Sequence, residues 1–264
     1  MKNILVPIGS NKSAISTLQY AIDFANEIDA HVYVISIFKE FSKVGGMAKV
    51  NTLLKEESQN TIDKVMNGTD HKNVTVIAHP VKGDPLEGVA RLCKHIDIDL
   101  MVLAPRSNSV KEEVYLGKMT GKLVKQTDIP VMIVPNDYIF SWPNKVLVAF
   151  KDGRFKRKHV LDPVAFIVKK AKAELHLLHV HTPDSTEESK ELNNTFPELV
   201  TSYTTTDNAT TYQGLLEHFQ TVNPDMICVV RRKRGFFKKL WEKNVVLKKE
   251  FYTTKPLLIL RGIS

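Results

Sequence analysis

A glycine followed by a lysine, Gly117-Lys118, is the segment of this chain whose residue types best suit phosphate chemistry. Glycine lets backbone amides approach phosphate oxygens, and a helix that begins there adds its N-terminal N–H groups. A phosphate-loop NTPase also needs a glycine five residues earlier and Ser or Thr directly after the lysine, where this chain has Glu112 and Met119. The spacing argues against that class and leaves two alternatives, a phosphate contact by Lys118 or a helix start with a surface lysine.

Basic side chains gather in two clusters of the second half of the chain. Residues 1–139 carry 16 basic and 16 acidic side chains and residues 140–264 carry 21 and 13, so the second half holds the whole net charge of +8. The clusters follow two apolar runs and include Lys151, Arg154, Arg231, Arg232, Lys233 and Lys243. They form either a solvated lysine-rich face or a site for a phosphorylated metabolite, nucleic acid or acidic protein.

The other residue types that could do chemistry form no catalytic set. Three histidines share one predicted strand, where alternation puts His179 and His181 on one face and His176 on the opposite face, so they cannot converge on a metal ion from this strand alone. The chain has no Cys-x-x-Cys pair and no Gly-x-Ser-x-Gly motif. We therefore expect no catalytic residue and no metal site, and a protein that is not an enzyme.

The elements that would position these residues alternate between strand and helix in each half. Apolar periodicity predicts strands at 3–8, 31–38, 73–79, 100–104 and 131–134, with helices at 13–28, 43–67, 85–96 and 112–127. In the second half it predicts strands at 145–150, 174–181, 199–205, 226–231 and 257–261, with helices at 157–172, 209–222 and 238–250. Asp84 and Pro85 form an expected helix start. Such alternation with apolar strands is typical of a parallel sheet covered on both faces.

The two halves repeat each other. Lys2-Asn3-Ile4-Leu5-Val6-Pro7 has its counterpart in residues 145–150, and an Asp-apolar run at Asp99 has its counterpart at Asp225. Repetition on this scale predicts two domains, 1–139 and 140–264, each long enough to bury its own core. We expect two tandem doubly wound, Rossmann-like α/β domains.

Composition places the chain among globular proteins of a reducing compartment. No run approaches the roughly 18 apolar residues that a membrane-spanning helix needs. The N-terminus enters a strand at once, so we expect no signal peptide, and each half holds one cysteine, Cys93 or Cys228. We expect a cytoplasmic protein without membrane insertion.

The first half opens with Ile-Leu-Val-Pro, continues with the Asp-apolar run and a loop ending in Leu116-Gly117, and closes with Pro130-Val131-Met132-Ile133-Val134. Together these segments resemble the universal stress proteins, here as a tandem pair. The resemblance implies a five-stranded parallel sheet of order 3-2-1-4-5 in each half, of the adenine nucleotide alpha hydrolase-like type. It also implies dimers, or pseudo-dimers within a tandem chain, paired along the fifth strand. The strands 131–134 and 257–260 are the expected pairing edges, within one chain or between two.

Many members of that family bind ATP through Gly-x2-Gly-x9-Gly followed by Ser or Thr. The resemblance maps this motif, with the end of the first strand, onto Pro7, Ile8, Gly9, Ser10, Ala104, Ser107, Gly117, Lys118 and Thr120. One glycine of three is retained, and no acid ends the first strand. In the second half all three glycine positions are lost, with Lys243 at the third.

Three functions follow from these residues. The first is a non-catalytic stress-response binding or regulatory module with a degraded nucleotide site and no cofactor. The second is an ATP-binding member that uses the first-half site around Gly117, with ATP in that half only. The third is an anion- or nucleic-acid-binding protein that uses the basic crevice of the second half.

Overall fold

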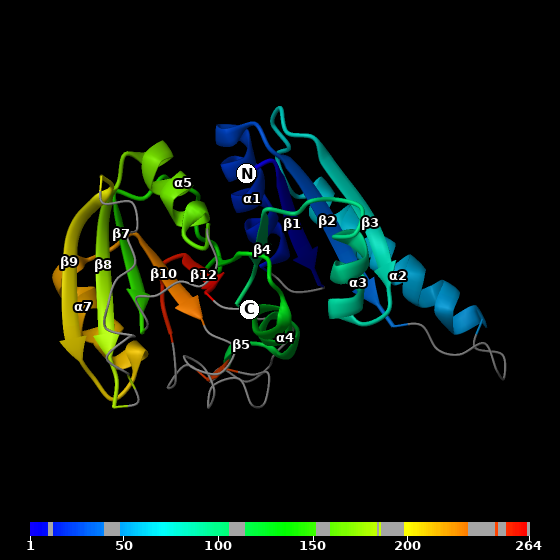
Figure 1. The fold of residues 1–264 in the computed structure, drawn as a ribbon. Helices are drawn as coiled ribbons and strands as arrows, with labels where there is room; N and C mark the ends of the chain where they lie inside the picture. The colour runs from blue at the N-terminus through cyan, green and yellow to red at the C-terminus, as the bar shows by residue number, and fades with distance from the viewer. Residues whose placement is uncertain are drawn as a thin grey trace. The chain divides into compact units, whose positions relative to one another are not determined.

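Both halves of the chain build a parallel β-sheet flanked by helices (Figure 1). The computed structural model describes residues 1–9, 13–39, 48–105, 114–151, 159–183, 185, 198–231, 246–247 and 252–262. Two compact units are present. Unit 1 comprises Met1–Ile129, Ile133–Phe140 and Lys243–Glu250, and unit 2 comprises Pro130–Met132, Ser141–Glu242 and Phe251–Ser264. Each unit therefore includes a short segment from the opposite half of the sequence.

The first half forms strands in the order β3-β2-β1-β4-β6, and the pairs β1/β2, β2/β3 and β1/β4 are parallel. Helix α1 packs beside α2, and α3 beside α4, as right-handed crossovers in this strand order require. The elements are β1 (Asn3–Ile8), α1 (Ala14–Ile28), β2 (His31–Phe38), α2 (Ala48–Asn67), β3 (Val76–Lys82), α3 (Pro85–Leu92), β4 (Leu100–Leu103), β5 (Val114–Leu116), α4 (Lys118–Gln126) and β6 (Val131–Ile133).

The second half repeats the order as β9-β8-β7-β10-β12, with parallel pairing throughout this series. The predicted strand order 3-2-1-4-5 is thus confirmed in both halves. The described elements are β7 (Lys145–Phe150), α5 (Asp162–Ala171), β8 (Glu174–His181), β9 (Val200–Asp207), α7 (Thr211–Val222), β10 (Met226–Arg231), β11 (Val246–Leu247) and β12 (Leu257–Arg261).

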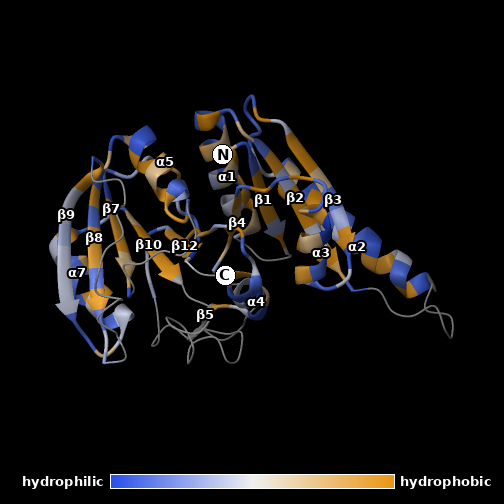
Figure 2. Ribbon diagram, viewed as in Figure 1, coloured by the Kyte–Doolittle hydropathy of each residue, from blue (hydrophilic) through white to orange (hydrophobic). Residues whose placement is uncertain are grey.

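The strands β1 and β7 form the core of the first and the second half of the chain. In β1, Ile4, Leu5 and Val6 are completely buried, and Val146 and Val148 are completely buried in β7. Both faces of these strands are covered, which explains why they are apolar at consecutive positions rather than at alternate ones. Figure 2 shows the contrast between the hydrophobic central strands and the pale, polar edge strand β9. Each fully buried aliphatic side chain contributes about 1.5–3 kcal/mol.

The repeated Asp-apolar run has the same structural role in both halves. The Asp99 carboxylate accepts the backbone N–H groups of Lys2 and Asn3, at 2.6 and 3.0 Å, where β1 begins. The Asp225 carboxylate does the same for the two residues where β7 begins, at 2.8 and 3.2 Å. Each aspartate therefore joins the start of its own strand to the start of the central strand beside it, which explains its presence in both halves.

A buried threonine is repeated in the same way. Thr127 Oγ1 accepts the N–H of Ile129 at 3.2 Å, and Thr253 Oγ1 accepts the N–H of Lys255 at 3.0 Å. Both threonines are less than a tenth exposed. These side-chain turns direct the chain into the closing strand of each half.

Several element boundaries differ from those that periodicity predicts. Strand β3 begins at Val76, three residues later than predicted, and helix α3 ends at Leu92 rather than at residue 96. Helix α5 begins at Asp162 because the proline that follows is best placed in the first helical turn. The Asp84 cap is confirmed, since its side chain accepts the Leu86 N–H at 3.0 Å.

Two predicted helices are wrong where short strands are found. Residues 112–127 were predicted as one helix, but Val114–Leu116 form β5 and the helix begins only at Lys118. Residues 238–250 were also predicted as a helix, but Val246–Leu247 form β11. The two strands pair with each other in antiparallel orientation, a contact that local periodicity cannot reveal. Among the described residues, no helix is long and apolar enough to cross a membrane.

Candidate functional site

The predicted nucleotide site of the first half lies where two neighbouring parallel strands, β1 and β4, end. Pro7 and Ile8 are buried at the end of β1, Gly9 follows them half-buried, and Ala104 follows β4. Ligands of doubly wound sheets bind at such carboxyl ends. No carboxylate is among these residues, so the end of β1 supplies main chain and apolar side chains to this edge.

The main chain that leaves β4 is hydrogen-bonded to the start of helix α4. Thr120 Oγ1 donates to the carbonyl of Ala104 at 3.0 Å, and the Gly117 N–H donates to the carbonyl of Pro105 at 3.0 Å. Thr120 is only 2% exposed. The hydroxyl hydrogen and the amide hydrogen that a phosphate could accept are therefore both bonded to the loop's own carbonyls.

Helix α4 begins directly after Gly117, whose extended backbone (φ −71°, ψ 170°) forms an N-cap without a side-chain hydrogen bond. The first helical residue is Lys118, which is exposed, and the first turn has no acidic side chain. A lysine here is disfavoured by the helix dipole by about 0.3–1 kcal/mol, whereas an anion at the same end is favoured. The helix start thus combines two features that attract an anion.

A second lysine of α4 is bound to the neighbouring helix. Lys122 Nζ lies 2.6 Å from Asp84 Oδ2, while Asp84 also caps α3. The hydrogen bond from Lys122 is the main cause that holds the pKa of Asp84 below its usual value. The sequence predicts the cap, because the cap is local, but it gives no signal for an ion pair between residues 38 positions apart.

The structure brings together only part of the predicted nucleotide site. Thr120 is hydrogen-bonded to Ala104, Gly117 is hydrogen-bonded to the next residue, Pro105, and Lys118 follows Gly117 on the surface. Ser10 and Ser107 lie outside the described residues. Sequence reasoning did not identify Pro105 as a partner, because any residue can supply a carbonyl acceptor and nothing in the sequence marks it.

The predicted anion site of the second half is described at two positions. Lys151 directly follows β7 and Arg231 is the last residue of β10, two strands that are parallel neighbours. Both positions therefore lie at carboxyl ends of central strands, where the sequence predicted them. The remaining basic residues of the prediction lie outside the described residues, namely Arg154, Arg232, Lys233 and Lys243.

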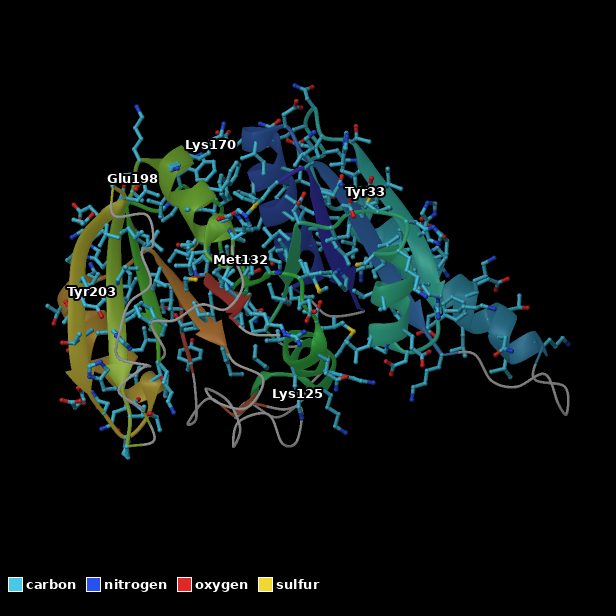
Figure 3. All side chains as sticks on the ribbon, viewed as in Figure 1. Tyr33, Lys125, Met132, Lys170, Glu198 and Tyr203 are labelled. Carbon is cyan, nitrogen blue, oxygen red and sulfur yellow. The ribbon has the colours of Figure 1, made fainter. Side chains whose placement is uncertain are left out.

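A buried histidine contacts the main chain of Lys151. His179 is completely buried, with Nε2 3.2 Å from the Lys151 carbonyl oxygen and Nδ1 2.8 Å from the Tyr203 hydroxyl. A carbonyl only accepts, so Nε2 carries the hydrogen and the Tyr203 hydroxyl donates to Nδ1. Burial raises the pKa of Tyr203, which keeps that donor protonated. Figure 3 shows Tyr203 on strand β9.

The other two histidines of β8 have separate partners. His176 lies 2.7 Å from the Ser202 hydroxyl and 3.2 Å from the Glu174 carboxylate, and His181 lies 3.5 Å from the Asp207 carboxylate. Within the described part of the chain, no group of three or more histidine, cysteine or acidic side chains is placed to hold a metal ion.

The described fold is similar to solved structures along the whole chain. One neighbour is a universal stress protein from Archaeoglobus fulgidus, 16% identical, with a TM-score of 0.72 over 99% of this chain and 97% of that chain. Another is a functionally unknown protein, PA1789, from Pseudomonas aeruginosa, 14% identical, with a TM-score of 0.57 over 99% and 93%. At these identities the likeness shows the fold.

Sequence comparison identifies the family. Universal stress protein MJ0531 of Methanocaldococcus jannaschii is 25% identical over 138 residues, which are 50% of this chain and 81% of that protein. The sequence profile of the universal stress protein family matches residues 1–135, half of the chain. The chain belongs to the universal stress protein family.

Proposed function

We propose that this universal stress protein is a non-catalytic binding and regulatory module whose first-half nucleotide site is degraded. The observation that supports this most directly is the pair of hydrogen bonds from Thr120 and Gly117 to the carbonyls that follow β4. A phosphate at this position would have to replace both bonds. Each contributes a net stability of about 0.5–1.5 kcal/mol, so their loss would weaken binding.

The residue types in the loop also argue against nucleotide binding. The family resemblance places glycines where Ala104 and Ser107 stand in this chain. A glycine lets a phosphate oxygen approach the backbone closely, whereas a Cβ at the same position occupies that space. The end of β1 supplies no carboxylate for a nucleoside. The site thus keeps the sheet edge and the helix start of a nucleotide-binding protein, but it lacks the two loop glycines that let phosphates approach the backbone and the carboxylate that contacts the nucleoside.

A second candidate is ATP binding at this site. The start of α4 supports it, because Gly117 leaves the helix without a side-chain cap and Lys118 is exposed at the first helical position. Backbone N–H groups at a helix N-terminus and a nearby lysine are the elements of many phosphate sites. This candidate requires the Gly117 and Thr120 bonds to rearrange when the nucleotide binds.

Identification of the small molecules carried by the purified full-length protein separates the two candidates. The protein is denatured and the released molecules are analysed by mass spectrometry. The proposal predicts no adenine nucleotide at a level approaching one molecule per chain. One ATP or ADP per chain, lost in a Lys118→Ala variant, would overturn the proposal and establish the second candidate.

A further inference from the structure

The strand before Gly117 is paired with a strand from the second half of the sequence. Strand β5 forms a two-stranded antiparallel sheet with β11, in which Val114 is opposite Leu247 and Leu116 is opposite Val246, with an irregularity between the last two residues. The segment Lys243–Glu250, which contains β11, belongs to unit 1. The pair therefore lies within the same unit as the Gly117 loop.

We propose that β11 is an intramolecular positioning strand for the Gly117 loop. Strand β5 has three residues, and β11 is its one strand partner in the described part of the chain. A three-residue strand without a partner gains too little to stay ordered. Tyr115 and Leu116 are buried, and the residue that follows them is the N-cap of α4. Whatever holds β5 thus also sets the position of Gly117.

The two paired strands lie at different places in the repeat. Val114-Tyr115-Leu116 is followed by Gly117, and Val245-Val246-Leu247 is followed by a lysine. Asp99 and Thr127 are separated by the same number of residues as their counterparts Asp225 and Thr253, yet the strand comes later in the second half. Only five residues separate β11 from Thr253, whereas α4 alone has nine. The stretch between β11 and Thr253 is therefore shorter than helix α4.

This placement adds one short segment of the second half to the unit that contains the Gly117 loop. The residues that flank β11 are basic, with Lys243 before it and Lys248 and Lys249 after it. One of the two basic clusters of the second half thus extends to the segment that supplies the partner of β5. The inference rests on the proposed function only in treating the Gly117 loop as the ligand-binding site, and the pairing itself is tested without any nucleotide.

Disulfide trapping tests the pairing. In a Cys93→Ser chain, Val114→Cys and Leu247→Cys place two thiols at opposite positions of the antiparallel pair, where Cα atoms are close enough for a disulfide. We expect mild oxidation to give an intrachain disulfide, seen as a faster-migrating monomer and confirmed by peptide mapping. The matched control, Lys118→Cys with Leu247→Cys, is four positions out of register. Equal trapping in both variants, no trapping, or trapping only as a covalent dimer would overturn the proposal.

Hydrogen exchange tests the positioning role. Val246→Pro removes a backbone N–H and disfavours the strand, whereas Val246→Thr keeps both the N–H and a β-branched side chain. The peptide spanning residues 114–121 should exchange about tenfold faster in Val246→Pro than in Val246→Thr, because its opening becomes easier. The peptide spanning α1 should exchange equally in both. Unchanged exchange at 114–121 would refute the positioning role, whatever the outcome for nucleotide binding.

Discussion

Thr120 illustrates how a residue can be retained by type and still change its role. A small hydroxyl near the last glycine of the family motif suggests a phosphate contact, and Thr120 is the closest match in this chain. In the structure its hydroxyl is buried and donates to Ala104. The exposed cation is Lys118, one position after the glycine. Among the residues of this site that the structure describes, Lys118 offers a positive charge, whereas the Thr120 hydroxyl hydrogen is already bonded to Ala104.

The ion pair between Lys122 and Asp84 leads to a pH-dependent prediction. Because folding lowers the pKa of Asp84, the pair stabilises the fold above the unfolded-state pKa of about 3.9 and loses this contribution as the pH falls through the folded-state value. Lys122→Met should lower the free energy of unfolding by at most about 1 kcal/mol at pH 7, since both groups are partly exposed. Urea unfolding at pH 7 and pH 2.5 measures the difference, which should shrink at the lower pH.

Lys118→Met is the matched control for this prediction. It removes an exposed lysine from the same helix without touching the pair. We expect the stability difference between this variant and the wild type to be the same at both pH values. A Lys122→Met effect that is equally large at pH 2.5 would contradict the assignment of the Asp84 pKa shift to Lys122.

At the scale of elements, the two halves conserve the residues that join strands rather than those that bind phosphate. Asp99 and Asp225 each bind the first backbone amides of a central strand, and Thr127 and Thr253 each form the same turn before the closing strand. These roles require no ligand. The repeat in the sequence is thus explained by the folding of two halves with the same strand order.

The paired aspartates give a prediction about stability. Asp99→Ala and Asp225→Ala should each lower the free energy of unfolding of their own half of the chain by about 1–3 kcal/mol, because two backbone N–H groups lose their acceptor. Asp63→Ala, on the exposed side of α2, should change it by less than about 0.5 kcal/mol. Urea unfolding of the three variants measures these effects. An effect of only one of the paired substitutions would show that the two roles are not equivalent.

Local sequence patterns predicted the elements that are stabilised by interactions between residues near one another in the sequence. The strand order and the Asp84 cap follow from apolar periodicity, the family resemblance and capping chemistry, and the structure confirms them. Strand β5 was missed because three residues before a glycine carry little periodicity and the strand forms through a distant partner. In the site, the family resemblance named Ala104, Gly117 and Thr120, which the structure places at the end of β4 and the start of α4. The sequence could not predict that the carbonyls of Pro105 and Ala104 accept the Gly117 N–H and the Thr120 hydroxyl, because every residue type has a main-chain carbonyl.

At the scale of the whole molecule, charge distinguishes the halves more than fold does. Both halves have the same strand order, but the net charge of +8 belongs entirely to residues 140–264. When basic side chains bind a polyanion, the salt dependence of the affinity increases with the number of phosphates that they neutralise. An anionic ligand of the second half is therefore a prediction of the sequence, to which the structure adds the positions of Lys151 and Arg231.

Charge reversal tests this prediction. Replacement of Arg231, Arg232 and Lys233 by glutamate should lower the salt concentration at which the protein elutes from an immobilised polyanion such as heparin. The control replaces Lys49, Lys55 and Lys64 by glutamate, three exposed lysines on α2 that change the net charge equally. A larger shift for the second-half variant supports a localised anion site. Equal shifts would mean that only the overall charge matters.

The degraded nucleotide site is tested most directly by calorimetric titration of the full-length protein with Mg-ATP. The loop carbonyls already bind the Gly117 and Thr120 hydrogens, so we expect no saturable heat at micromolar nucleotide. Saturable binding with a Kd in the micromolar range, worth about −8 kcal/mol, would contradict it.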